Sequence, residues 1–255
     1  MSIVIQQGIT IQGGITIGAG ASAAASANGS ALFNSSGQYL STQGGAATAM
    51  GTGSFTWECW VYATGNSAYA AFIDTRGSQT GYSGTNNDGA YLGLEFGNLL
   101  PMYYQNGAII ASSIAVASNA WTHVALVRNG TTTTLYVGGQ IGGTYNSDNL
   151  NFSAPYVDIG GTSADINLRL SGYISNLRMV KGVAVYTAAF TVPTTDLPAT
   201  QSANTYGNPS AAITGTQTSL LLNTYNGAGF LTDTSTNAFT VTNNGSVTSS
   251  TQAPF

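Results

Sequence analysis

The chain has 255 residues, of which five are basic and nine acidic, and its formal net charge is −4. This length accommodates one large β-sandwich with extensions, or two small domains. The five cations are scattered and form no basic stripe, which argues against the counterion-displacing surface that nucleic-acid binding requires.

Uncharged polar residues and aromatic residues take the place of charge in this sequence. The 14 Tyr, 9 Phe and 3 Trp supply large apolar bodies for a core and distinguish the chain from a disordered one. Lys181 is the only lysine, so few charged side chains protect sheet edges, and we expect those edges to be closed or covered by partner subunits. The single cysteine, Cys59, rules out an internal disulfide. The N-terminus lacks a signal-peptide pattern and no stretch is apolar enough to cross a membrane, so we expect no membrane insertion and no secretion.

The first 20 residues stand apart as a predicted β arm. Three triplets of β-branched character recur every six positions, and the glycine-containing spacers between them permit turns. Such an arm could form a hairpin or add strands to a partner. The alternative is that residues 1–20 supply the first strands of the domain itself. The residues assigned to assembly in this arm are Ile3, Val4, Ile5, Ile9, Ile11, Ile15 and Ile17.

From residue 30 to about residue 192, short apolar runs alternate with turn signals at the spacing typical of an antiparallel sandwich. Asn-Gly and Gly-Gly pairs, as at 129–130 and 138–139, favour positive φ and tight turns. No window carries an apolar period of 3.6 residues over a helical length. Strands are predicted at residues 30–33, 38–41, 54–62, 70–74, 90–96, 100–104, 108–110, 121–128, 133–137, 155–159 and 168–180.

Four motifs in this region are informative in their exact residues and spacing, and not only in their alternation of apolar and polar residues. They are Ala31-Leu32-Phe33-Asn34 with Gly37-Gln38-Tyr39-Leu40, the run 55–61 that contains Glu58-Cys59-Trp60-Val61, the run 121–128 followed by Leu135-Tyr136-Val137-Gly138-Gly139, and the run 170–178. In order and spacing they resemble the opening strand pair, the next long strand, the distinctive hairpin and the closing strand of laminin-G-like domains. The resemblance implies an all-β fold, an antiparallel two-sheet jelly-roll sandwich of the concanavalin A-like type.

The sequence that follows narrows the resemblance. Residues 179–186, then Phe190-Thr191-Val192-Pro193, are similar to the version of the domain found in bacteriophage virion proteins. Residues 218–255 also resemble those proteins, in Leu220-Leu221-Leu222, in the run 233–237 and in the final Pro254-Phe255. In the proteins it resembles, such a segment commonly precedes the opening strand, so here the unit looks circularly permuted.

The predicted organisation therefore has three parts. Residues 1–20 form the β arm, residues 21–198 the laminin-G-like sandwich, and residues 199–255 a C-terminal extension. We predict that C-terminal strands complete the sandwich, with residues 218–242 beside residues 30–41. The pairing could occur within one chain or across to a neighbour.

Catalytic chemistry finds little support in the sequence. Jelly-roll glycoside hydrolases pair carboxylates on one strand, whereas the only two glutamates, Glu58 and Glu95, are isolated. His123 is the only histidine and has no nucleophile–carboxylate set near it in sequence. Cys59 has no neighbouring cation that would lower the pKa of its thiol. Both residues are predicted to be structural, and no enzymatic activity is expected.

Two kinds of ligand are considered. No cofactor is required, but the resemblance suggests calcium, which laminin-G-like domains often hold at the rim through an Asp and backbone carbonyls. The alternative is that such an Asp forms a turn by bonding its own backbone. The candidate calcium ligands are Asp74, Asp88 and Asp165.

A glycan site would place exposed aromatic rings beside hydrogen-bonding side chains. The alternative is that these rings pack in the core or along sheet edges. The candidate glycan contacts are Tyr69, Tyr82, Tyr103, Tyr104, Tyr145 and Asn146.

The resemblance implies a structural virion protein of a bacteriophage: a small fibre, a tail or baseplate appendage, or a capsid decoration on the outer surface of the particle. The protein would be made in the host cytoplasm, and its arm would bind other virion proteins. A homo-oligomer is expected, with a trimer favoured. The alternative function is a receptor-binding adhesin that recognises a host-surface glycan.

Overall fold

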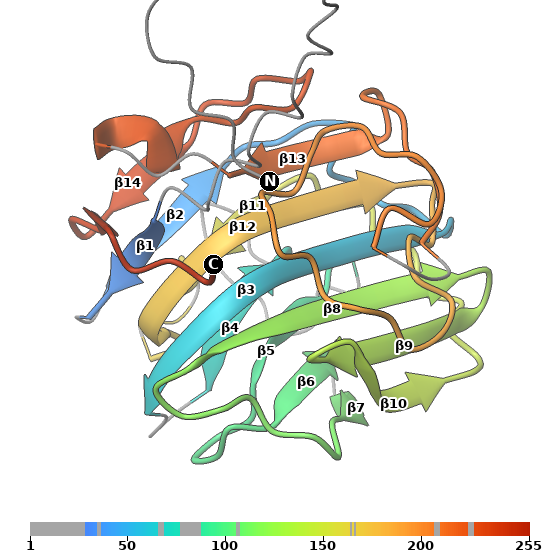
Figure 1. Cartoon of the computed structure of the whole chain (residues 1–255), viewed down its shortest axis with the longest axis horizontal. Coiled ribbons are helices and arrows are strands. Elements are labelled where there is room, and N and C mark those ends of the chain that lie inside the picture. The colour runs from blue at the N-terminus through green and yellow to red at the C-terminus, as the bar shows by residue number, and fades with distance from the viewer. Residues whose placement is uncertain are drawn as a thin grey trace, which may run out of the picture.

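Two antiparallel sheets stack face to face in the computed structural model of the chain (Figure 1). The structure describes residues 29–34, 37–65, 69–76, 88–105, 108–163, 165, 167–206, 210–223 and 227–255. The all-β, two-sheet jelly-roll class predicted from the sequence is confirmed. The β arm and all seven of its assembly residues lie outside the described residues.

One sheet has eight strands. Its order is β10-β9-β8-β3-β12-β1-β15, and β13 also pairs with β12. The strands are β1 (Ser30–Phe33), β3 (Phe55–Gly65), β8 (Trp121–Asn129), β9 (Thr132–Val137), β10 (Gln140–Tyr145), β12 (Ser171–Lys181), β13 (Thr218–Leu222) and β15 (Thr248–Ser250).

The other sheet has seven strands, in the order β14-β2-β11-β4-β5-β6-β7. They are β2 (Tyr39–Thr42), β4 (Ala70–Asp74), β5 (Tyr91–Leu94), β6 (Pro101–Tyr104), β7 (Ala108–Ala111), β11 (Val157–Ile159) and β14 (Thr242–Asn244). A single 3-10 turn, η1 (Gly227–Leu231), is the helical element among the described residues, and no described helix has the length and apolarity needed to cross a bilayer.

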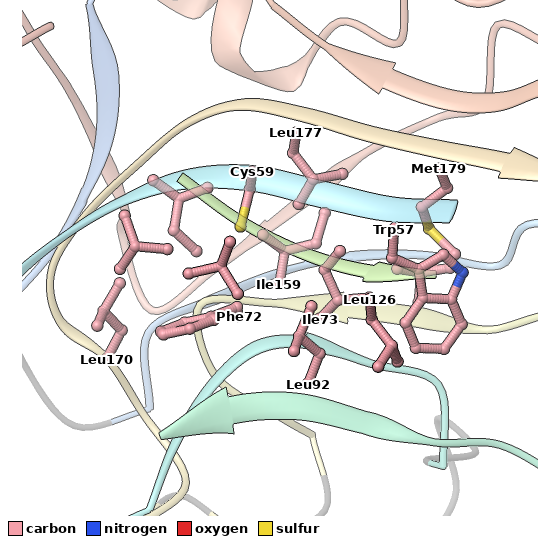
Figure 2. Close-up of a cluster of buried hydrophobic side chains, with 14 of the residues drawn as sticks. Trp57, Cys59, Phe72, Ile73, Leu92, Leu126, Ile159, Leu170, Leu177 and Met179 are labelled. Atoms are coloured by element: carbon pink, nitrogen blue, oxygen red, sulfur yellow. The ribbon is translucent and has the colours of Figure 1, made fainter. Parts of the chain in front are cut away.

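The core lies between the two sheets and follows from the period-two alternation of the strands. On β3, Trp57, Cys59 and Val61 point inward and are fully buried. Cys59 is the free thiol of the chain, and its burial raises the pKa of the thiol, as suits the structural role expected for it. Figure 2 shows side chains of both sheets meeting in this core, among them Trp57, Leu126, Leu177 and Met179 opposite Phe72, Ile73, Leu92 and Ile159.

One strand between residues 30 and 192 was not predicted. β10 is mostly exposed and contains two glycines, Gly142 and Gly143, which are poor strand formers. The glycines are needed because a Cβ on Gly142 would collide with the side chain of Ser112, and a Cβ on Gly143 would meet Ile110. The Ser113 amide donates to the Gly142 carbonyl at 2.8 Å, so the two sheets join along this edge.

The C-terminal segment adds strands to both sheets within the same chain. β14 pairs with β2, and β15 pairs with β1. The predicted strand pairing is corrected in one respect. β13 pairs with β12 and not with residues 30–41, and the strands that do pair with β1 and β2 come from residues 242–250. Asp233 fixes the turn after β13, because its carboxylate accepts hydrogen bonds from the amides of Leu221, Ser235 and Phe239.

Residues 183–206 and 210–213, here called the cover segment, cross the outer face of the eight-stranded sheet. Figure 1 shows them as an orange trace that runs over β12, β3 and β8. Val185, Tyr186 and Phe190 of this segment are buried against Ala125 of β8 and Tyr136 of β9. The outer face of this sheet is therefore partly closed by its own chain.

We predict that Leu220→Ala, in β13, lowers the free energy of unfolding by about 2–5 kcal/mol, because it leaves a cavity where a fully buried side chain stood. Urea denaturation measures the change. Ile141→Ala is the control, since Ile141 is 50% exposed on β10. Equal effects of the two substitutions would contradict the placement of β13 in the core.

Candidate functional site

A buried polar network lies beneath the cover segment. Arg178 Nε donates to Glu58 Oε1 at 2.8 Å, and its Nη2 lies 2.7 Å from the same oxygen. The Tyr186 hydroxyl donates to Glu58 Oε2 at 2.8 Å, and His123 Nε2 lies 3.2 Å from that oxygen. Glu58, His123 and Arg178 are fully buried. The network joins β3, β8 and β12 to the cover segment.

Electrostatics hold Glu58 in its ionised form. Burial alone would raise the pKa of this carboxyl, but the charge of Arg178 and the hydrogen bonds from His123 and Tyr186 lower it to about 2. Burial, reinforced by the nearby Glu58 charge, raises the pKa of the Tyr186 hydroxyl. Glu58 and Tyr186 are therefore not poised to exchange protons near neutral pH.

Glu58 is far from the only histidine in sequence, but the fold brings the two side chains into contact. Register between β3 and β8 places Trp60 opposite His123, and Glu58 lies two residues further along the same face. The chain thus contains a Glu–His contact that sequence spacing does not reveal. Because no solvent reaches these atoms, the contact has the structural character expected of His123.

A different part of the molecule is open to ligands. A cavity of about 220 Å³ lies on the outer face of the seven-stranded sheet. β5 and β6 supply its floor, Arg76 follows β4, and the loop between β11 and β12 forms one wall. The lining residues are Tyr69, Arg76, Tyr91, Met102, Tyr104, Asp165 and Leu168.

A bulge in β4 determines which of its side chains face the cavity. The register between β4 and β5 shifts between Ala71 and Ile73, so both Phe72 and Ile73 enter the core. Ala71 then packs on the outer side with Tyr91 and Met102. The bulge thereby lets Asp74, one residue after Ile73, reach Arg76 at the cavity.

Arg76 is fixed in the floor of the cavity. Its Nε and Nη2 donate to the two carboxylate oxygens of Asp74 at 3.0 and 2.8 Å, and its amide donates to Asp74 as well, at 2.9 Å. The guanidinium carbon lies 4.8 Å from the ring centre of Tyr91 and 5.0 Å from that of Tyr104. A neutralised cation between two aromatic rings makes a rigid, preformed surface.

The rim of the cavity is aromatic on one side and acidic on the other. Tyr69 is 39% exposed and lies 5.7 Å, ring centre to ring centre, from Phe96, which is 61% exposed. Asp165 faces the cavity from the loop after β11. The combination offers ring faces for apolar contact and a carboxylate for hydrogen bonding.

Three of the predicted ligand residues meet at this cavity: Tyr69, Tyr104 and Asp165. Tyr103 does not, and its assignment to a glycan site is corrected. Along β6 its side chain points inward, is fully buried, and donates from its hydroxyl to Asp148 at 2.9 Å. Burial and the Asp148 charge raise the pKa of that hydroxyl.

The remaining candidates lie elsewhere. Tyr145 and Asn146 are exposed at the end of β10, in the other sheet, and Asp88 is exposed just before β5. None of these three lines the cavity. Tyr82 lies outside the described residues.

The calcium hypothesis stays a prediction. Asp74 directs both carboxylate oxygens to Arg76, and Asp165 Oδ1 accepts hydrogen bonds from the amide and side chain of Asn167. Within the part of the chain that the structure describes, no three His, Cys, Asp or Glu side chains gather in a way that could hold a metal ion.

Sequence reasoning missed four of the lining residues, Arg76, Tyr91, Met102 and Leu168. A signal for the first was present, since Arg76 is one of only five cations and directly follows a predicted strand. Successive residues of β5 and β6 point to opposite faces of the sheet. The sequence therefore could not tell whether Tyr91 and Met102 point outward or into the core without knowing the orientation of at least one residue in each strand.

A comparison with family models matches residues 34–192 to the laminin-G family described as the concanavalin A-like lectin/glucanases superfamily. The chain belongs to this family. No curated protein matches it in sequence at the significance threshold.

Solved structures share the fold at low identity. A provisionally assigned carbohydrate-binding protein from Bacteroides ovatus has a TM-score of 0.57 and 16% identity, covering 89% of this chain and 60% of the other. The chain thus spans about 60% of that protein's length. A sialidase module from Ruminococcus gnavus, CBM40, bound to α2,3-sialyllactose, has a TM-score of 0.49 and 13% identity, covering 62% and 91%. Domains LG4–5 of mouse laminin α1 have a TM-score of 0.47 and 14% identity, covering 66% and 47%.

We expect Glu58→Gln to lower the free energy of unfolding by about 3–5 kcal/mol, because it leaves the buried Arg178 without its counter-charge. Urea denaturation at neutral pH measures the loss. Glu95→Gln, in the partly exposed turn after β5, is the matched control and should change stability by less than about 0.5 kcal/mol. A small effect of Glu58→Gln would show that the network does not stabilise the fold.

The low pKa of Glu58 also predicts a pH dependence. Its folded-state value of about 2 lies below the ordinary value of 4.5, so its contribution is fully present above pH 4.5 and is lost as the pH falls towards 2. The difference in unfolding free energy between wild type and Glu58→Gln should therefore shrink over this window. A difference that stays constant down to pH 2.5 would contradict the low pKa of Glu58.

Proposed function

We propose that this chain is a non-enzymatic glycan-binding module, and that the cavity on the outer face of the seven-stranded sheet is its binding site. The observation that carries the proposal is the convergence of aromatic rings and hydrogen-bonding groups on one preformed cavity. Ligand sites are typically concave and largely apolar, with a few polar groups that fix orientation. The apolar face of a sugar ring would contact Tyr69 or Tyr104, and its hydroxyls would face Asp165.

The size of the cavity supports recognition of a small unit. Pockets for drug-sized ligands range over about 300–1,000 Å³. At about 220 Å³ the cavity is smaller, so it would hold one sugar ring, with any further rings outside it. The exposed Tyr69 and Phe96 pair would lie along the path of those rings.

The biological setting we propose is the surface of a bacteriophage particle. The support is the resemblance of residues 179–193 and 218–255 to phage virion proteins. In this setting the module is displayed outward on a small fibre, a tail or baseplate appendage, or a capsid decoration. The β arm anchors it to other virion proteins, and the copies form a closed homo-oligomer. Glycan recognition on such a surface would make the protein a host adhesin.

Tyr69→Ala tests the site. It should weaken binding of the best glycan-array ligand at least tenfold, or about 1.4 kcal/mol, because a ring face for the sugar is lost. Isothermal titration measures the affinity. Tyr145→Ala is the matched control, since Tyr145 is 37% exposed, against 39% for Tyr69, but lies on β10 of the other sheet. An equal loss in both variants, or a loss only in Tyr145→Ala, would place the site elsewhere.

Removal of residues 1–20 tests the setting. The shortened protein should keep its fold and its glycan affinity but fail to join phage particles, because the proposed anchoring strands are gone. Mass spectrometry of purified particles measures incorporation against the full-length chain. Normal incorporation of the shortened chain would refute the anchoring role.

A further inference from the structure

We propose that Asp165 makes the cavity selective for a neutral, hydroxyl-rich sugar and excludes sugars that carry a carboxylate. This inference rests on the proposed glycan-binding function and adds the chemical class of its ligand. Three observations support it: the oxygen of Asp165 that has no partner among the described residues, the two-point pairing of Arg76 with Asp74, and the hydrogen bonds that hold the loop of Asp165 in place.

The first observation concerns the two carboxylate oxygens of Asp165. Oδ1 accepts hydrogen bonds from the Asn167 amide at 2.8 Å and from Asn167 Nδ2 at 2.9 Å. Oδ2 has no partner among the described residues, while the side chain as a whole is only half-buried at the wall of the cavity. Asn167 therefore orients the carboxylate and leaves one oxygen as an acceptor. A sugar hydroxyl is a donor for this oxygen, and a hydrogen bond to an ionised acceptor is about twice as strong as a neutral one.

The second observation concerns Arg76, the one cation among the described residues that line the cavity. Arg76 is 6% exposed, and both oxygens of the Asp74 carboxylate, which is 1% exposed, are bonded to it. A sugar carboxylate that used Arg76 as its counter-charge would compete with this buried ion pair. Breaking such a pair is costly, because the displaced carboxylate stays buried without a counter-charge. Arg76 thus serves as a rigid floor and not as a receptor for acids.

The balance of charge points the same way. Asp74 neutralises Arg76, so among the described lining residues Asp165 is the charge without an ion-pair partner in the lining. Asp158, opposite Asp74 in the β11–β4 register, is buried, and burial raises the pKa of its carboxyl, which favours the neutral form. The like charge that an acidic ligand would meet at the cavity is therefore that of Asp165.

The third observation is the anchoring of the loop that carries Asp165. Asp158 Oδ2 accepts hydrogen bonds from the Ser163 amide and hydroxyl, each at 2.7 Å. The Thr162 hydroxyl donates to the same oxygen at 3.3 Å. Leu168, on the far side of Asp165, bonds through its amide to the Asp165 carbonyl at 2.9 Å. The described residues before and after Asp165 in this loop are thus hydrogen-bonded, which limits the freedom of the loop to turn Asp165 away from an acidic ligand.

The experiment compares neutral sugars with their acidic counterparts on the full chain at pH 7. The probes are the methyl glycosides of glucose, galactose and mannose and the corresponding methyl uronides, which differ only by a carboxylate at C6. Binding is followed by amide chemical shifts of the cavity residues, with ligand up to about 100 mM, far above a Kd of about 1 mM. We expect at least one neutral glycoside to bind, and its uronide to bind at least tenfold more weakly. The discrimination should fall in 1 M salt, because screening weakens like-charge repulsion.

Asp165→Asn separates the charge from the shape of the side chain. The amide oxygen can still accept from Asn167, so the loop should keep its conformation, which the unchanged amide spectrum of residues 158–163 would verify. The variant should bind the neutral glycoside about tenfold more weakly and should discriminate against the uronide less than threefold. Asp88→Asn, an exposed change that does not line the cavity, should alter neither value.

The outcomes separate the two proposals. If the uronide binds as tightly as the neutral glycoside, or if Asp165→Asn changes neither affinity nor discrimination, the selectivity proposal is overturned while glycan binding stands. If no sugar of either class shifts the cavity residues, the binding function itself fails and the selectivity proposal fails with it. Tenfold discrimination that disappears in Asp165→Asn but persists in Asp88→Asn supports both.

Discussion

The buried ion pair between Glu58 and Arg178 determines which face of this sandwich is available for function. Two charges without solvent are tolerated only when they are paired and their remaining hydrogen bonds are made. Tyr186 and the Pro198 carbonyl each add a hydrogen bond to this pair, and both belong to the cover segment. The eight-stranded sheet therefore requires the cover segment on its outer face, and the seven-stranded sheet is left to present a cavity.

The same rule governs the rest of the charge in this weakly charged chain. Within the described residues, eight of the 14 charged side chains are buried, and six of these form three ion pairs: Glu58–Arg178, Asp74–Arg76 and Asp148–Arg128. Arg128 also donates to the carbonyls of Gly51, Gly53 and Leu150, so it ties loops across one end of the core. Charge thus acts mainly inside the protein, and the Asp74–Arg76 pair is the one that shapes the proposed binding site.

The sequence predicted the fold well because alternation and turn chemistry are local signals. The run 54–62, with Trp57 and Cys59 on one side, was recognisable as a strand whatever its partners. β10 escaped prediction because its glycines reflect contact with Ser112 and Ile110, which is visible only in three dimensions. Part of the candidate site could be predicted for the same reason, since Tyr69 and Tyr104 are aromatic residues that the sequence itself offers as sugar contacts. The inward direction of Tyr103 and the position of Arg76 could not be predicted, because they depend on strand pairing and on the bulge in β4.

The division between a closed and an open face is tested most directly by a crystal structure of the full chain with its glycan-array ligand bound. We predict density for one sugar ring over the seven-stranded sheet, in contact with Tyr69 or Tyr104 and hydrogen-bonded to Asp165, with the cover segment unmoved. A ligand bound under a displaced cover segment, beside Glu58 and His123, would contradict the claim that this network exists to close its face of the sandwich.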